Sequence, residues 1–248
     1  MLLDIIANHF SGVYNQYMEI VHLHDWHVGL ARAVEIQKEL AARVSRVGTL
    51  TGPRFIAGVD ISVNRWSKTG TGAVVILNYP ELELVEVQVI TDRVDFPYIP
   101  GLLSFRELPL IIKACEKLTI KPDLIMVDGQ GYAHPRRMGI ASHLGLLLNV
   151  PTIGCAKSRL CGDCAGPGNE EGNYSELIDK GEVIGAALRT RADTNPVYVS
   201  IGHMIDLPAA MHWVLACCRG YRLPEPARLA HQAAGGIIKF QAPRYNYQ

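Results

Sequence analysis

The spacing of apolar residues changes several times along the chain, and each change predicts a different element. At 28–46, Ala, Leu, Val and Ile recur at helical spacing with Glu and Lys between them, which indicates an amphipathic helix. Three strands are predicted next, at 55–63, 72–79 and 83–91, with short turns between them. Neighbouring strands joined by short turns pair antiparallel.

The rest of the chain alternates helical and strand patterns. The predicted elements are a helix at 105–118, a strand at 123–128, a helix at 136–148, a strand at 151–155, strands at 182–189 and 196–202, and helices at 207–219 and 225–238. Strands separated by helices pair in parallel. We therefore expect an α/β fold in which three antiparallel strands and then parallel strands form one mixed sheet flanked by helices, with no linker that divides it.

Two apolar strands end in an aspartate. Residues 55–59 lead into Asp60, and residues 124–127 lead into Asp128, which Gly129-Gln130-Gly131 follows at once. An aspartate at such a place can simply turn the chain. If the two strands are neighbours, however, the carboxylates meet at one sheet edge, and a pair held in this way suits a divalent metal.

The segment between these strands adds a stiff loop and a third acid. Pro97 and Pro100 fix φ, and Gly101 allows a tight bend, so the loop presents Tyr98 for stacking on a base. Glu107 then enters the predicted helix as a third metal ligand. The alternative is a capping box, Ser104-x-x-Glu107, although the nearby proline at 109 argues against it.

Cations accompany these acids. His134 and Arg136-Arg137 follow the turn after Asp128, and Lys157 follows the strand at 151–155 with Arg159 close behind. The glycines let a ligand approach the backbone closely, and a phosphate fits such surroundings. We interpret Arg137 and Arg159 as solvated charges, but Lys157 and His134 as part of the site.

Composition limits the alternatives. The 248 residues include 24 basic and 24 acidic side chains, so a polyanion would have to be held by a local patch or a metal. No apolar run approaches the roughly 18 residues of a membrane span, and the start lacks a secretory signal pattern. We expect a cytoplasmic protein that contacts no membrane.

The cysteines and the N-terminal histidines are assigned no chemistry. We expect the six cysteines to be reduced. Cys161 and Cys164 form a lone CxxC without a second ligand pair, so a surface loop is favoured over zinc. His22, His24 and His27 precede the first helix without an acidic or thiol cluster, and we do not interpret them as a metal site.

Several blocks of this sequence resemble those of the endonuclease V family. The resemblance rests on ordered blocks at 56–60, 98–107, 127–129, 134–136, 151–154, 156–158, 195–196, 200–203, 221–226 and 228–231. It extends from 25 to 235, which predicts a single catalytic domain at 25–248 after an N-terminal extension at 1–24. It implies a ribonuclease-H-like fold in a monomer that binds nucleic acid.

The resemblance also implies an activity and its residues. The activity is Mg²⁺-dependent cleavage of DNA, with Mn²⁺ as a substitute, at the second phosphodiester 3′ to deoxyinosine. Asp60, Glu107 and Asp128 would bind metal, while Lys157 and His134 would steady the scissile phosphate. The remaining assignments are a wedge of Tyr98, Ile99 and Pro100, a base pocket of Gly101, Leu103, Gly129, Ile140 and Gly154, and an open role for His231.

Three alternatives stay open. One is an inosine-specific ribonuclease acting on single-stranded RNA, because a pocket for the base does not specify the sugar. Another is a module that binds inosine without cleaving. The third is a ribonuclease-H-like nuclease without base preference, from which the proline-framed Tyr98 loop separates our interpretation.

Overall fold

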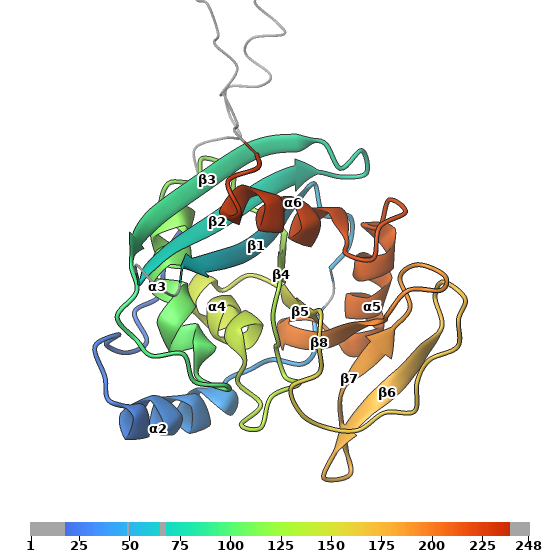
Figure 1. Ribbon diagram of the computed structural model, residues 1–248, viewed down its shortest axis with the longest axis horizontal. Coiled ribbons are helices and arrows are strands. Elements are labelled where there is room, and N and C mark those ends of the chain that lie inside the picture. Colours follow the sequence, from blue (N-terminus) through green and yellow to red (C-terminus); the bar gives the residue numbers. More distant parts are fainter. Residues whose placement is uncertain (1–17, 49, 65–67, 239–248) are drawn as a thin grey trace, which may run out of the picture.

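The sheet places the two aspartate strands side by side. In the computed structural model, which describes residues 18–48, 50–64 and 68–238, eight strands form one sheet in the order β3-β2-β1-β4-β5-β8-β7-β6 (Figure 1). The strands are β1 Phe55–Asn64, β2 Thr69–Asn78, β3 Leu84–Arg93, β4 Leu124–Val127, β5 Thr152–Ala156, β6 Tyr174–Asp179, β7 Glu182–Leu188 and β8 Val197–His203. β1 pairs antiparallel with β2 and parallel with β4. The predicted mixed α/β sheet is confirmed, but its parallel part stops at the β4–β5 pair, because β8, β7 and β6 pair antiparallel.

Two apolar layers cover the sheet because side chains alternate along each strand. Helices α3 Leu103–Cys115 and α4 Ile140–Leu148 pack on the face that carries Ala57 and Ile125. Helices α5 Leu207–Ala216 and α6 Glu225–Ala234 pack on the face that carries Ile56 and Met126. Helix α2 Leu30–Ala41 joins α3 and α4 through a smaller apolar cluster.

Some boundaries differ from the sequence prediction. The helix predicted at 136–148 begins only at Ile140. Arg137 has a φ of 58°, and Gly139 lies so close to the preceding turn that a Cβ there would be 2.2 Å from the Gln130 carbonyl oxygen. Residues 132–139 therefore form a compact turn. Strand β6 was not predicted, because only Leu177 among its side chains is buried and its apolar signal is weak.

The segment that precedes α2 belongs to the packed structure. Met18 is buried, and the Val21 N–H donates to the Leu147 carbonyl of α4 at 2.7 Å. We therefore propose that the catalytic domain includes residues 18–24, which the predicted boundary assigns to an extension. Among the described helices, none has both the length and the apolar character needed to cross a membrane.

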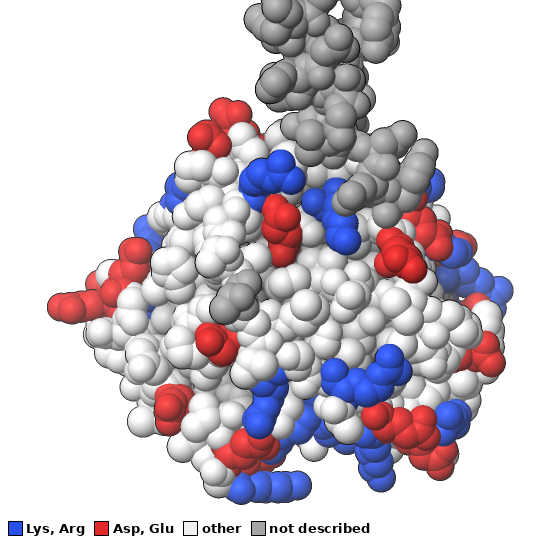
Figure 2. Space-filling view, turned by 180° about the vertical axis from the view of Figure 1, so that it is seen from behind, with Lys and Arg blue, Asp and Glu red and all other residues white. Residues whose placement is uncertain are grey.

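Charges on the surface are mixed in sign. On the face shown in Figure 2, lysines and arginines are interspersed with aspartates and glutamates, as the equal numbers of 24 basic and 24 acidic residues suggest. A nucleic acid would therefore be held on this face by particular side chains rather than by one broad positive field.

Helix α6 approaches strand β1 very closely at one glycine. A Cβ at Gly58 would lie 1.8 Å from the Pro226 carbonyl oxygen, a distance that no side chain can tolerate. Gly58 lies two residues before Asp60, and α6 carries His231. The absence of a side chain at Gly58 thus sets how closely His231 approaches Asp60.

Replacing this glycine tests the packing. We expect Gly58→Ala to reduce the free energy of unfolding by about 1–3 kcal/mol or more, because the methyl group forces α6 away from β1. The control is Gly29→Ala, where a Cβ would meet nothing within 4 Å and the loss should stay below about 1 kcal/mol. Denaturant titration measures both, and equal stability of the two variants would contradict the packing argument.

Candidate active site

Asp60 and Asp128 meet where the parallel pairing of β1 with β4 ends, although β1 itself continues past Asp60 to Asn64. The register pairs Val59 with Val127, and the Asp128 N–H donates to the Val59 carbonyl at 3.0 Å. The side chains of Asp60 and Asp128 are only 12% and 10% exposed. Burial, and then the charge of Asp128, raise the pKa of Asp60. This repulsion between two shielded carboxylates is what a bound cation would relieve.

His231 and Lys157 surround the two acids. The Nδ1 of His231 lies 2.7 Å from Asp60 Oδ2, and Lys157 forms an ion pair with Asp128 Oδ2. Asp60, Asp128 and His231 each offer a ligand atom, and these three atoms lie within 4.8 Å of one another. Carboxylate oxygens and an imidazole nitrogen form a donor set that suits Mn²⁺, and its carboxylates suit Mg²⁺.

Glu107 faces the same space from α3. It lines one cleft together with Asp60 and Asp128. Burial chiefly, followed by the charges of Asp60 and then Asp128, raises the pKa of Glu107 to about 8. Near neutral pH and without a cation, the carboxyl therefore holds its proton for most of the time.

The capping-box alternative for Glu107 is wrong. Helix α3 has Leu102 at its N-cap with no side-chain cap hydrogen bond, and Ser104 Oγ is buried without a partner. Glu107 therefore does not begin the helix, and its side chain is available to the cleft.

The cleft has room for a ligand beside these acids. Its volume is about 430 Å³, and its lining includes Tyr98 and four predicted pocket or wedge neighbours, namely Pro100, Gly101, Leu103 and Ile140. Gly129 also lines it. Tyr98 is 64% exposed, so its ring is free to stack on a base. The Tyr98 loop and the acids thus share one opening.

Two predicted contact residues have other surroundings. Ile99 packs against the apolar cluster that contains Ala33 and Ile36 of α2. Gly154 lies under the turn at 129–131, where a Cβ would be 2.4 Å from the Gly131 nitrogen. Gly154 does not line the cleft; it allows the close approach of β5 that supports the turn.

His134 is held by backbone atoms at both ring nitrogens. Its Nδ1 accepts the Arg136 N–H at 3.1 Å, so its Nε2–H donates to the Gly101 carbonyl at 2.9 Å. Burial is the main cause that lowers the pKa of His134 to about 4, so the ring is neutral. In this geometry neither nitrogen is free to bind the phosphate that the sequence interpretation assigns to it.

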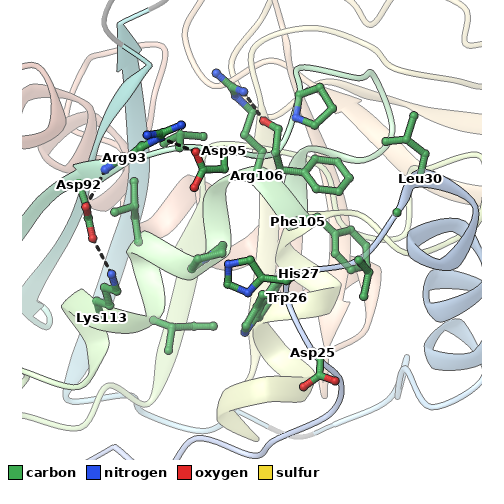
Figure 3. A pocket seen from close by; sticks show the side chains of 18 of the residues that line it. Asp25, Trp26, His27, Leu30, Asp92, Arg93, Asp95, Phe105, Arg106 and Lys113 are labelled. Atoms are coloured by element: carbon green, nitrogen blue, oxygen red, sulfur yellow. Dashed lines mark hydrogen bonds and ion pairs between the residues drawn. The ribbon is translucent and has the colours of Figure 1, made fainter.

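A larger hollow of about 1070 Å³ lies between α3, the end of β3 and residues 22–30 (Figure 3). Trp26 and Phe105 contribute to its lining, and four of its charged side chains pair with one another, Arg93 with Asp95 and Lys113 with Asp92. It contains none of the predicted metal ligands. The smaller cleft beside the acids is therefore the candidate active site.

The remaining candidates for metal chemistry have other partners. The Nε2 of His24 lies 2.7 Å from the Nε2 of buried His143. Cys161 and Cys164 are free thiols that pack against Ala133 and its buried neighbours near β6. The single candidate group of metal ligands found among the described residues is the one at Asp60, Asp128 and His231.

Comparisons with known proteins agree on one family. The family model for endonuclease V matches residues 38–232. Endonuclease V of Gloeobacter violaceus is 53% identical over 224 residues, which cover 89% of this chain and 91% of that protein. A crystal structure of endonuclease V from Bacillus subtilis has a TM-score of 0.85 at 34% identity, covering 89% of this chain and 97% of the other.

A related structure contains nucleic acid. A variant of endonuclease V from Ciona intestinalis was crystallised with a 23mer DNA containing an inosine followed by a ribo-adenosine. That chain is 28% identical, with a TM-score of 0.74 and coverage of 84% of this chain and 95% of its own. The likeness extends over most of both chains.

Titration of Glu107 has a measurable effect on stability. Its pKa in the folded protein is raised to about 8. The contribution of this carboxyl to the free energy of unfolding is therefore complete below the pKa that it has in the unfolded chain, and it is lost as the pH rises through its folded pKa. With chelator present, the free energy of unfolding of Glu107→Gln minus that of the unsubstituted protein should therefore increase by at least ~1 kcal/mol from pH 5 to pH 9.

The matched control is Glu116→Gln, at the exposed C-cap of the same helix. It makes the same substitution at a position that does not line the cleft and gives the reference for the pH series. A constant difference for Glu107→Gln would contradict the burial of Glu107 next to the aspartates.

Proposed function

Because this chain belongs to the endonuclease V family, we propose that it is a Mg²⁺-dependent endonuclease that cuts DNA at the second phosphodiester 3′ to deoxyinosine, with Mn²⁺ as a substitute. The observation that supports this most directly is the convergence of Asp60, Asp128 and His231, because Asp60 and Asp128 line the same cleft as the Tyr98 loop and Glu107. Metal chemistry and base recognition then share one opening.

Asp60, Asp128 and His231 would hold the cation, with Glu107 joining them. When bound, a divalent cation activates water and stabilises the charge that develops on the phosphate. The donor set fits such an ion, because burial and then the charge of Asp128 raise the pKa of Asp60, and a cation would relieve both effects. Glu107, protonated near neutral pH without a cation, would release its proton when positive charge arrives.

Lys157 supplies the positive charge nearest to these acids. Its ammonium group pairs with Asp128 Oδ2 and lies 3.4 Å from His231 Nδ1. A cation at the carboxylates would weaken this pairing and leave the ammonium group available to a phosphate oxygen. Arg222 holds the backbone of Lys157, since its Nη2 donates to the Lys157 carbonyl at 2.6 Å.

Base extrusion is assigned to the loop before α3. Tyr98 projects its ring into solvent, while Ile99 anchors the loop in the apolar cluster beneath α2. An inosine that leaves the stack needs both a group to fill the gap and a pocket to receive it. Gly101, Leu103, Gly129 and Ile140 line the adjoining cleft and would form that pocket.

Cleavage of four matched strands tests the proposed function. We expect the protein to cut deoxyinosine DNA in Mg²⁺ or Mn²⁺ but not in chelator, and to leave the same DNA without inosine intact. Parallel assays on inosine RNA and plain RNA show which sugar is accepted. Asp128→Asn should reduce the rate more than about 100-fold, since even residues that only support a ligand cost 10–100-fold.

The control for that variant is Asp163→Asn, whose side chain is 96% exposed. Equal cutting of plain DNA would favour a nuclease without base preference. Binding of inosine strands without any cleavage would favour a non-cleaving module, and cleavage in chelator would contradict the role of the metal.

Substitution of Tyr98 tests the wedge. Tyr98→Ala should reduce kcat/KM on duplex deoxyinosine DNA by about 10- to 100-fold, because stacking on an aromatic ring contributes ~1–3 kcal/mol per base. Tyr98→Phe retains the ring and should remain within about threefold of the unsubstituted protein. Equal activity of the alanine and phenylalanine variants would show that the ring is not used.

A further inference from the structure

Helix α2 has one polar residue on its buried face. The buried positions are Ala33, Ile36, Gln37 and Leu40, which have helical spacing, and Gln37 is only 1% exposed. An apolar residue at Gln37 would complete the stripe. A buried amide is costly unless its donors and acceptor find partners, so the partners of Gln37 indicate what it does.

Gln37 itself lines the candidate active site, and its partners are Gly101, which also lines it, and two residues of the compact turn at 132–139. Its Nε2 donates to the carbonyls of Gly101 and Met138, both at 3.0 Å, and its Oε1 accepts from Arg136 Nε at 2.6 Å. These contacts fix the orientation of the amide. If it were flipped, its oxygen would face two carbonyls and its NH₂ group would face a guanidinium group.

The Gly101 carbonyl is the centre of this network. It accepts from Gln37 Nε2, from His134 Nε2 at 2.9 Å and from Arg136 Nη2 at 2.7 Å. Gly101 has a φ of 82°, a left-handed conformation that glycine adopts readily. Three donors on one carbonyl exceed what is needed to satisfy a buried oxygen.

Gly101 lies between Tyr98 and helix α3, the two parts of this segment that act in the proposed site. Gly101 comes three residues after exposed Tyr98 and two before the first residue of α3, the helix that carries Glu107. Among the described residues, Arg136 forms no ion pair with a carboxylate; its charge is directed at the oxygens of Gln37 and Gly101. Gln37 thus connects α2 to the base of the Tyr98 loop.

We propose that Gln37 is a positioning residue that fixes Gly101, so that Tyr98 meets the nucleic acid at a set place while the base is extruded. This inference rests on the proposed function. It gives α2, which carries no ligand of the metal, a role in selecting the altered base. A residue that only packs the core would lower activity on every substrate alike. A positioning residue instead predicts a loss of kcat/KM that is larger when the altered base is firmly stacked.

Two DNA duplexes separate positioning from simple stability. They differ only in whether the inosine is paired with cytosine or lies opposite an abasic site, where extrusion costs less. Gln37→Met retains the volume and loses all three hydrogen bonds, and Gln37→Glu retains the acceptor for Arg136 while losing both donors. Lys38→Met, at the exposed neighbouring position, is the matched control.

We expect both Gln37 variants to lose about tenfold or more in kcat/KM on the paired duplex, and less than about threefold opposite the abasic site, since small displacements of positioned groups cost up to 10²-fold. Lys38→Met should behave as the unsubstituted protein. An equal loss on both duplexes, or no loss on either, would overturn the role of Gln37. Failure of the unsubstituted protein to cut either duplex would instead overturn the proposed function.

Discussion

The parallel pairing of β1 with β4 is the constraint on which the site depends. Residues 55–59 of β1 and all of β4 are short apolar runs that the sheet buries, and an aspartate follows each run. The register that pairs Val59 with Val127 leaves Asp60 and Asp128 side by side, mostly shielded from water. The folding energy of the two apolar layers therefore holds together two carboxylates that repel each other, and a cation can stabilise the pair.

The other parts of the site are held by the elements around this pair. Gly58 lets α6 lie against β1, which brings His231 to Asp60. Helix α3 brings Glu107 to the cleft from the opposite face of the sheet. Because different layers contribute these groups, a shift of either helix changes the ligand set without changing the strands.

Much of this arrangement could be predicted from the chain itself. Asp60 and Asp128 follow apolar runs, and the prolines around Tyr98 mark a stiff loop, so local patterns are sufficient for them. The position of His231 could not be predicted, because it depends on how closely two distant elements pack. The contacts of His134 are likewise made with Gly101 and Arg136, and these are visible only in the fold. Gln37 interrupts an apolar stripe, a signal that could have drawn attention to it.

Direct titration with Mn²⁺ tests the central claim that these acids form a cation site. Calorimetry of the unsubstituted protein should show saturable binding, and Asp60→Asn combined with Asp128→Asn should abolish it while the fold is retained by circular dichroism. Undiminished Mn²⁺ binding by the folded double variant would contradict the account.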